Sequence, residues 1–521
     1  GNVAESGTTA TFTVVLNAQP DSNVVISVTS GDTGEATVSA ANLTFTNANW
    51  NSAQTVTVTG VDDNIIDGNI NTTITMAVVD ASSDNNFDDV ANQTVTATTT
   101  DDDTALTSVN STKTNGSYKA GELIPINIIF NSQVTVTGTP QLTLETGDSD
   151  AVVNYSSGSG GFSLVFNYTV GAGNNSSDLD YASTGALALN GGSINDADGN
   201  PATLTLPTPG AANSLGANKA LVIDTSAPSA FTTGSVTSVG GTVVANYWNS
   251  LNTSITVTVP VANDATLTGG TIQLQANVAG GGFETFGAAY TIQGSDLGTN
   301  YDFNQNAAVF EALSGGLQES ESVTFRAIIT DLAGNSTTGS ASGTTIAVDQ
   351  VAPTNQDDVF PSAASETVGG TVTIVSSGTA SNQVWIAPAG TTSFSASATM
   401  TQAGSGTATS MTAPTTAGTY YVYVIDEAGN VSSASTAALT VGNAGFTLGA
   451  ISGTVTEAAS TATFTVVLDS RPDSDVVISV TSADTGEVTV SSGTLTFTNG
   501  NWNNAQTVTL TGVDDNVIDV D

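Results

Sequence analysis

The stretch "QTVTVTGVDDNIIDGN" (54–69) places a strand pattern directly before an acidic loop. Thr and Val alternate from Thr55 to Thr59, so that β-branched side chains point to both faces of an extended backbone. This period of two predicts a half-buried β-strand that ends at Gly60. The loop after it carries three carboxylates within six residues, which are Asp62, Asp63 and Asp67.

Almost the same string returns as "QTVTLTGVDDNVIDVD" (506–521). Residues 1–69 align without a gap to 453–521, with 49 of 69 positions identical. A further strand-like segment, "NAGFTLGAIS" (443–452), precedes the later copy and has no counterpart before the first. We interpret the chain as a window of a longer tandem array with a period of 452 residues, in which both ends fall inside the same kind of domain.

The segments between the two copies also follow strand patterns. "AVVNY" (151–155) and "FSLVFNYTV" (162–170) flank "SSGSGG" (156–161), a sequence typical of a hairpin loop. No segment shows a sustained helical period, and short strands follow one another at close spacing. The predicted fold class is therefore all-β, in the form of tandem immunoglobulin-like antiparallel β-sandwich domains arranged as an elongated rod.

Junction strings divide the 521 residues, which are too many for a single core. "LVIDTSAPSA" (221–230) and "IAVDQVAPTN" (346–355) each read as a final strand, an Asp and then Ala-Pro, a stiff joint between domains. Five domains are predicted, at 1–103, 104–227, 228–350, 351–442 and 443–521. The first would lack its leading strand, and the last would be a truncated second copy of 1–69.

The charge balance limits the possible partners. The chain has 47 acidic and 5 basic residues and a formal charge of −42, although only 10% of its residues are charged. Such an excess of carboxylates repels phosphate backbones and anionic lipid, so we expect no nucleic-acid partner and no membrane insertion. Carboxylate and carbonyl oxygens are hard ligands that suit calcium, the expected cofactor.

Catalytic chemistry has little support in the sequence. The absence of His and Cys removes the usual nucleophile–base pairs and any disulfide, so we expect no enzyme. A glycosidase needs only two carboxylates, but they should flank a cleft lined by aromatic residues. Trp50 and Trp502 occupy equivalent repeat positions and are expected to be packing residues, while Trp248 and Trp385 lie in separate domains.

The block "LTFTNANWNSAQTVTVTGVDDNIIDGN" (43–69), with the later "DDD" (101–103), resembles the Calx-β family of Ig-like modules. In that family an early Glu, an acidic loop and a final Asp cluster converge at one end of the sandwich and bind calcium. The resemblance implies the following ligands in the first copy: Glu5, Asp62, Asp63, Asp67, Asp101, Asp102 and Asp103. In the second copy it implies Glu457, Asp514, Asp515 and Asp519.

The acidic loop departs from the family pattern at one position. Asp67 and Asp519 stand where the family usually has Glu, and the shorter side chain puts bidentate ligation in question. From the residues alone, clustered carboxylates need a counter-ion because their mutual repulsion opposes ionisation. The competing interpretation is a solvated loop of turn-forming Asp residues without a metal.

The middle of the chain carries a second resemblance. The string "YKAGELIPINIIFNSQVTVTGTPQLTLETG" (118–147) is similar to an Ig-like module of giant bacterial surface and type I-secreted adhesins, and 228–350 and 351–442 are similar to looser members of that class. The recurring strings "DADGN" (196–200), "DLAGN" (331–335) and "DEAGN" (426–430) predict turns, with cation binding as the alternative.

These resemblances imply a structural repeat unit of an extracellular fibre, adhesin stalk or surface layer that is stabilised by calcium. The expected location is the cell surface, and the expected partners are neighbouring copies, joined covalently or by strand donation. The alternative is an adhesive module that binds a surface glycan or protein through one domain. The domain at 228–350 is the candidate, with "NYWNS" (246–250) and "FETFGAAYTI" (283–292).

Overall fold

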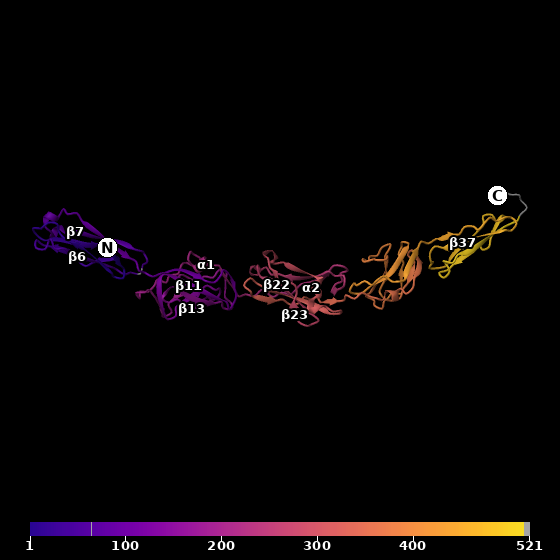
Figure 1. The fold of residues 1–521 in the computed structure, drawn as a ribbon, viewed down its shortest axis with the longest axis horizontal. Coiled ribbons are helices and arrows are strands. Elements are labelled where there is room, and N and C mark those ends of the chain that lie inside the picture. The colour runs from indigo at the N-terminus through magenta and orange to yellow at the C-terminus, as the bar shows by residue number, and fades with distance from the viewer. Residues whose placement is uncertain (64, 515–521) are drawn as a thin grey trace. The chain divides into compact units, whose positions relative to one another are not determined.

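The computed structural model of the protein describes residues 1–63 and 65–514. Its elements are nearly all β-strands (Figure 1), as the sequence predicts. The helices of the described part are single turns, at α1 (Leu215–Asn218), α2 (Ala307–Glu311) and α3 (Gln356–Val359). The chain divides into two compact units, Gly1–Ala227 with Asp331–Asn335, and Pro228–Thr330 with Ser336–Asp521.

The first unit begins with a sandwich of a five-stranded and a three-stranded sheet. The larger sheet has the order β1-β8-β7-β3-β5 and the smaller β2-β6-β4. These strands are β1 (Asn2–Ala4), β2 (Thr9–Val14), β3 (Val24–Ser30), β4 (Ala36–Val38), β5 (Asn42–Phe45), β6 (Gln54–Gly60), β7 (Ile70–Val78) and β8 (Gln93–Thr100). The 3-10 turns η1 (Asp80–Ser82) and η2 (Asn85–Phe87) lie between β7 and β8.

The alternation in β6 produces the predicted two faces. Val56 and Val58 are buried, while Thr55 is exposed and Thr57 is half-buried. The buried valines pack in a core with Phe45, and Trp50 is partly buried against that core. Trp502 packs in the same way against the core of the second copy, so the predicted packing role of both residues is confirmed.

The second sandwich of this unit pairs a seven-stranded sheet with a three-stranded one. The larger sheet has the order β16-β12-β13-β14-β11-β17, with β9 paired to β11, and the smaller β10-β18-β15. The strands are β9 (Leu106–Ser111), β10 (Gly116–Tyr118), β11 (Leu123–Thr137), β12 (Gln141–Leu144), β13 (Ala151–Ser157), β14 (Gly161–Thr169), β15 (Asn175–Ser176), β16 (Leu187–Ala188), β17 (Ser193–Asn195) and β18 (Leu221–Asp224). The predicted hairpin is β13–β14, with Tyr155 opposite Phe166.

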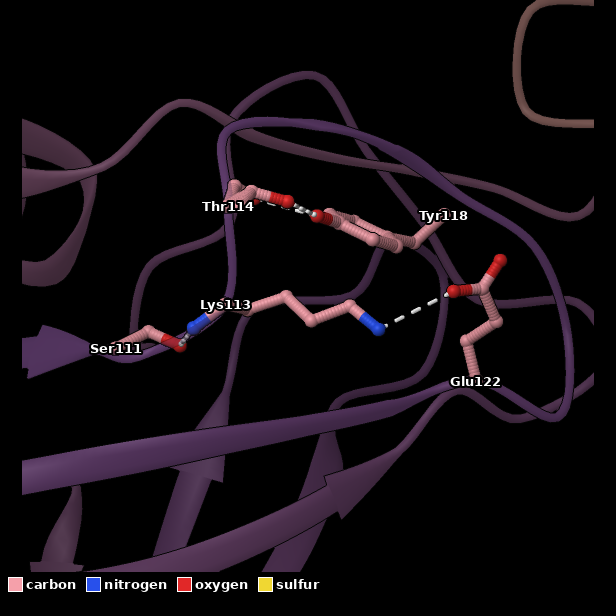
Figure 2. Close-up of polar contacts among 5 residues, drawn as sticks. All are labelled: Ser111, Lys113, Thr114, Tyr118 and Glu122. Atoms are coloured by element: carbon pink, nitrogen blue, oxygen red, sulfur yellow. Dashed lines mark hydrogen bonds and ion pairs between the residues drawn. The ribbon is translucent and has the colours of Figure 1, made fainter.

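Two of the five basic residues make local contacts beside β10 in this sandwich. Lys113 forms an ion pair of 3.3 Å with Glu122, and its Nζ lies 4.7 Å from the centre of the Tyr118 ring (Figure 2). The Nζ of Lys219 donates to the backbone carbonyl of Lys113. These cations therefore serve local structure and are not available as an exposed basic patch.

The second unit begins with a sandwich of similar design. Its larger sheet has the order β20-β28-β26-β22-β23, with β24 on β22 and β27 on β26, and its smaller sheet is β19-β21-β25. The strands are β19 (Val236–Val239), β20 (Tyr247–Trp248), β21 (Ser254–Pro260), β22 (Thr271–Val278), β23 (Phe283–Thr285), β24 (Tyr290–Thr291), β25 (Asn300–Asn306), β26 (Ser322–Thr330), β27 (Ser336–Thr338) and β28 (Ile346–Val348). The 3-10 turns are η3 (Ala265–Leu267), η4 (Gly294–Asp296) and η5 (Leu313–Gly315).

Two smaller sandwiches complete the second unit. In the first of them the sheets are β29-β35-β34-β31-β32 and β30-β33, and in the second β36-β37-β41-β39 and β38-β40. The strands are β29 (Ala364–Thr367), β30 (Thr371–Thr373), β31 (Gln383–Ala387), β32 (Thr401–Gln402), β33 (Ser410–Thr412), β34 (Gly418–Ile425), β35 (Ala438–Gly442), β36 (Phe446–Leu448), β37 (Thr461–Leu468), β38 (Val476–Ser479), β39 (Val488–Val490), β40 (Thr494–Phe497) and β41 (Gln506–Gly512).

Most ladders are antiparallel, but four of the described sandwiches share a parallel pair. In each of these, a short early strand pairs with the last strand of its sandwich, as β1 with β8, β10 with β18, β20 with β28 and β29 with β35. Strands as short as β20 give no readable period, so the sequence did not reveal this pairing. The early strand forms an edge of the larger sheet in three of these sandwiches, and an edge of the smaller sheet β10-β18-β15 in the other.

The recurring "D-x-x-G-N" strings form turns, as predicted. The Oδ1 atom of Asp196 accepts hydrogen bonds from three backbone N–H groups of its own turn, and Asp331 and Asp426 bind their turns in the same manner. The structure adds a role at a joint within the second unit. The fully buried Asn430 donates to the carbonyl of Asp349 (2.8 Å) and accepts from the backbone N–H of Ser250 (3.0 Å).

Candidate metal centre

Four chain segments end at the same end of the first sandwich, and each brings at least one carboxylate. Glu5 lies in the turn after β1, Glu35 immediately before β4, Asp67 in the loop after β6, and 101–103 directly after β8. Because neighbouring strands run in opposite directions, every second loop of an antiparallel sandwich lies at the same end. Residues far apart in the sequence are thereby collected at this end.

Gly60 brings the first of these segments close to the acidic loop. A Cβ atom at this position would lie 2.1 Å from the carbonyl oxygen of Ala4, a distance that no side chain tolerates. The N–H of Gly60 donates to Thr8, and the next N–H, of Val61, donates to the carbonyl of Glu35 (2.9 Å). The glycine at the start of the loop is therefore needed for the turn that carries Glu5 to approach the loop.

The carboxylates form two overlapping groups that share Glu5. In one group, oxygens of Glu5, Glu35 and Asp67 lie within 4.8 Å of one another, and in the other, oxygens of Glu5, Asp101 and Asp103 do so. Asp101 also organises the backbone, because its Oδ2 atom accepts from the N–H of Gly68 (2.8 Å) and its Oδ1 atom from that of Asp103 (2.9 Å).

Burial makes this arrangement unfavourable without a counter-ion. Glu5 is 2% exposed and Glu35 is 7% exposed. Desolvation, reinforced by the charge of Asp101 and other carboxylates, raises the pKa of Glu5 to about 7. Desolvation also raises the pKa of Glu35, followed by the charge of Asp67, and it raises the pKa of Asp103. One oxygen of each of these three side chains is buried without a hydrogen-bond partner.

This donor set fits a divalent cation of the calcium type. Every candidate ligand is a carboxylate oxygen, and calcium takes oxygen ligands at about 2.3–2.6 Å. Two ligands on opposite sides of one ion are then separated by at most about 4.6–5.2 Å, and the oxygens of each group lie within 4.8 Å of one another, so they are close enough to share one ion. The partnerless oxygens of Glu5, Glu35 and Asp103 supply unsatisfied acceptors at the same place.

The structure brings together part of the predicted ligand set. Glu5, Asp67, Asp101 and Asp103 belong to the two groups. Among the described residues, Asp62, Asp63 and Asp102 belong to neither group, although their charges raise the pKa of Asp103. These three residues therefore add negative charge near Asp103, but their oxygens are not part of either carboxylate group.

The second copy is less complete in the described part of the chain. Glu457 and Asp514 are exposed, and neither is in a carboxylate group among residues 1–63 and 65–514. Asp515 and Asp519 lie outside the described residues. The loop glycine keeps its role, since a Cβ atom on Gly512 would lie 2.1 Å from the carbonyl oxygen of Thr456.

Glu35 is the cluster member that sequence reasoning missed. It lies 27 to 32 residues before the acidic loop, in "DTGE" (32–35), and this string returns unchanged as 484–487. The sequence did offer one signal for Glu35, since an acidic residue stands at this place in both copies, directly before a strand. Glu35 is far from the other acidic residues in the sequence, however, so the sequence does not show that it lies close to them in space.

Two of the five aromatic residues in the strings proposed for glycan binding are core residues. Trp248 and Phe286 are fully buried in the third sandwich, where Trp248 packs on Phe310 with ring centres 4.6 Å apart. Tyr290 and Tyr301 stack at 3.7 Å and remain half-buried. Tyr247 and Phe283 are half-buried as well, so three of the five aromatic residues of this set remain partly accessible.

No described helix is long and apolar enough to cross a membrane.

Comparison with protein-family models and with curated proteins gives no match. Solved structures with some likeness include sets of tandem domains. One is the FN1–FN3 domains of chicken CNTN1, which match at 13% identity over 64% of this chain and 97% of that chain, with a TM-score of 0.23. Another is the titin domains A168–A170, which match at 9% identity over 65% of this chain and 97% of that chain, also with a TM-score of 0.23.

The four N-terminal Ig domains of Dscam1 align over a larger share of this chain. They match at 11% identity over 85% of this chain and 96% of that chain, with a TM-score of 0.14. Likenesses of this size carry no argument about function. The all-β sandwich fold rests on the strand pairing described above.

Proposed function

We propose that the chain is a structural repeat unit of an extracellular, rod-like fibre, adhesin stalk or surface layer on the cell surface, and that calcium stabilises it. Its proposed partners are neighbouring copies of the same chain or repeat, and we propose no catalytic role. The proposal is supported by the tandem β-sandwiches, the copies at 1–69 and 453–521 that are identical at 49 of 69 positions, and the excess of carboxylates.

The observation that carries the calcium part of the proposal is the pair of carboxylate groups on Glu5. Three buried carboxylate oxygens without hydrogen-bond partners lie among them. Glu5, Glu35, Asp67, Asp101 and Asp103 would hold the ion, which supplies positive charge that offsets their mutual repulsion. Because Asp101 and Asp103 directly follow β8 and precede β9, binding would also fix the backbone where the second sandwich begins.

The first test is a thermal melt of the whole chain with calcium and with EGTA. A ligand at one hundred times its Kd stabilises the folded state by about 2.7 kcal/mol. For a sandwich of this size, that corresponds to a rise in Tm of roughly 10 °C or more in the transition of the first sandwich. Magnesium at the same concentration should shift it less, because magnesium demands stricter geometry and keeps its waters.

Glu35→Gln is the diagnostic variant. It removes a buried negative charge, so the metal-free Tm should stay the same or rise, while the calcium shift should shrink. Asp89→Asn is the matched control, because Asp89 is an exposed acid of the same sandwich outside both groups, and it should leave the calcium shift intact. An equal Tm in calcium and EGTA for the unmodified chain would refute the calcium role.

The alternative adhesive role has less support. Its candidate aromatic residues Trp248 and Phe286 are buried, and an apolar groove of about 510 Å³ lies in the first sandwich, away from them. Binding of the chain to a glycan array that is abolished by Tyr290→Ala and Tyr301→Ala would favour the adhesive role instead.

A further inference from the structure

A polar pocket lies where the fourth sandwich meets the fifth, within the second unit. We name it the joint pocket, and it has a volume of about 360 Å³. Its walls include Ser365 and Thr440, which are paired in the ladder between β29 and β35, and Arg471, Trp502 and Asn503, which lie in two loops of the fifth sandwich. None of its described lining residues is acidic, although the chain has 47 acidic residues.

The guanidinium group of Arg471 is held in a fixed orientation at the wall of this pocket. Its Nη1 atom donates to the carboxylate of Glu366, whose side chain is 2% exposed, and its Nε atom donates to the carbonyl of Asn499 (3.3 Å). The described structure gives the other terminal nitrogen, Nη2, no hydrogen-bond partner, and the Arg471 side chain is 35% exposed. Because Glu366 balances its charge, Arg471 offers the pocket a planar donor without an excess of charge.

The pocket does not depend on strands that follow the acidic loop. The first copy has Gln19, Trp50 and Asn51 at the positions of the three loop residues, and there β7 and β8 are present. Gln19 and Asn51 are nevertheless exposed, and Trp50 is half-buried. β7 and β8 therefore do not cover this end of the sandwich, and the Arg at position 471 is a feature of the second copy alone.

The chemistry of the lining fits a neutral sugar. A sugar ring has C–H faces that pack on an aromatic ring such as Trp502, and hydroxyl groups at its edge that accept from Arg471 and Asn503. The hydroxyls of Ser365 and Thr440 can both donate and accept. A volume of about 360 Å³ lies within the usual range of ligand pockets.

Charge and polarity select against other occupants. An anionic sugar or an acidic peptide would be repelled by a chain of formal charge −42. A cation would find no carboxylate among the described lining residues. An apolar ligand would cover the polar groups of the lining and leave them without hydrogen-bond partners.

We propose that the joint pocket binds a neutral sugar residue of a polysaccharide, with the ring on Trp502 and its hydroxyls on Arg471 and Asn503. The inference goes beyond the proposed fibre role, because it gives the chain a ligand. It also differs from the adhesive alternative, whose aromatic residues lie in the third sandwich. The pocket shares no residue with the carboxylate groups on Glu5, so this proposal and the calcium proposal fail separately.

Isothermal titration calorimetry of the whole chain with defined oligosaccharides tests the proposal. The neutral probes are cellohexaose, maltohexaose, mannohexaose and chitohexaose, and the acidic probe is hexagalacturonate. At least one neutral probe should bind with a Kd of about 1 mM or tighter, and hexagalacturonate should not bind. The Kd should be the same in calcium and in EGTA, because the lining holds no metal ligand.

Asn503→Ala is the diagnostic variant, since Asn503 is exposed and its replacement leaves the fold intact. The loss of its amide contact should weaken binding by about tenfold. Asn51→Ala is the matched control at the equivalent exposed position of the first copy, and it should leave the Kd unchanged. Arg471→Gln, which introduces the residue that the first copy has there, should weaken binding at least as much as Asn503→Ala.

Several results would overturn the proposal. One is the absence of binding by every neutral probe at about 10 mM. Another is an equal Kd for the parent chain, Asn503→Ala and Arg471→Gln, because the sugar would then lie elsewhere. Binding of hexagalacturonate alone would contradict the neutral ligand, and binding that disappears in EGTA would mean that the sugar contacts a calcium ion and not this pocket.

Discussion

At the scale of single residues, Asp67 and Glu35 of the candidate metal centre differ in how easily they can be recognised in the sequence. Asp67 stands out because it belongs to a dense acidic string. Glu35 does not, and yet it is the more deeply buried carboxylate of the two. A buried carboxylate oxygen without a hydrogen-bond partner is energetically costly. The burial of Glu35 therefore indicates a candidate metal ligand more clearly than its position in the sequence does.

Gly60→Ala should unfold or distort the end of the first sandwich. The added Cβ atom would lie 2.1 Å from the carbonyl oxygen of Ala4, which forces apart the segments that carry Glu5 and the acidic loop. We expect a loss of about 2–3 kcal/mol in the free energy of unfolding and a reduced calcium shift, measured by denaturant melts followed through Trp50 fluorescence.

Gly453→Ala is the matched control for this substitution. Its Cβ atom would meet open space, so its stability should change by no more than about 0.5 kcal/mol. If Gly60→Ala proved as harmless as Gly453→Ala, the close approach would not determine the position of Glu5.

At the scale of elements, the joints within the second unit depend on buried polar contacts. Asn430, at the end of a turn in the fourth sandwich, links Asp349 at the end of β28 with Ser250 after β20. At the next joint, Arg471 pairs with Glu366, whose side chain is buried in β29. The sequence predicted the turn that contains Asn430, but not its partner, because the partner lies 81 residues away.

The joint at Asp349 should weaken as the pH rises. Desolvation first, and then the charges of Asp426 and Glu319, raise the pKa of Asp349 from 3.8 to about 6. A carboxyl whose folded pKa is raised contributes stability that is fully present below about 3.8. That stability is lost as the pH rises through about 6.

Melts of the chain between pH 4 and pH 7 measure this effect. Asp349→Asn should remove on the order of 1 kcal/mol of the pH-dependent change in stability, since partial exposure screens the interaction. Asp148→Asn, at an exposed acid of another sandwich, should leave the profile unchanged. An identical pH profile for Asp349→Asn and the parent chain would contradict the assignment.

At the scale of the whole molecule, the charge of −42 is the dominant property. Only five basic residues oppose it, and among these Lys113 and Arg471 are in ion pairs. A large net charge of one sign keeps a chain soluble, but it also opposes compact folding and close approach of copies. Cations in solution therefore become part of the stability of this protein.

Monovalent salt should stabilise the sandwiches without reproducing the calcium effect. Raising NaCl from 0.01 to 0.15 M shortens the Debye length from about 30 to about 8 Å, so every melting transition should move up by a few degrees. Calcium at matched ionic strength should add a further shift in the first sandwich, resolved by differential scanning calorimetry. If NaCl alone produced the whole shift, the cation effect would be general screening and not binding at the carboxylate centre.

The amino-acid sequence alone determined the all-β class, the alternating faces of β6, the hairpin β13–β14 and the turns at Asp196, Asp331 and Asp426. These features depend on neighbours within a few residues, where side-chain period and turn chemistry act directly.

Only the tertiary structure decided the contacts between distant segments. It placed Glu35 beside Glu5, left Asp62, Asp63 and Asp102 outside the carboxylate groups, and formed an apolar groove of about 510 Å³ between β2, β7 and β8. Each of these depends on how far apart strands from different parts of the chain come to lie. That distance is set by sheet pairing and side-chain packing across the sandwich, and no local pattern encodes it.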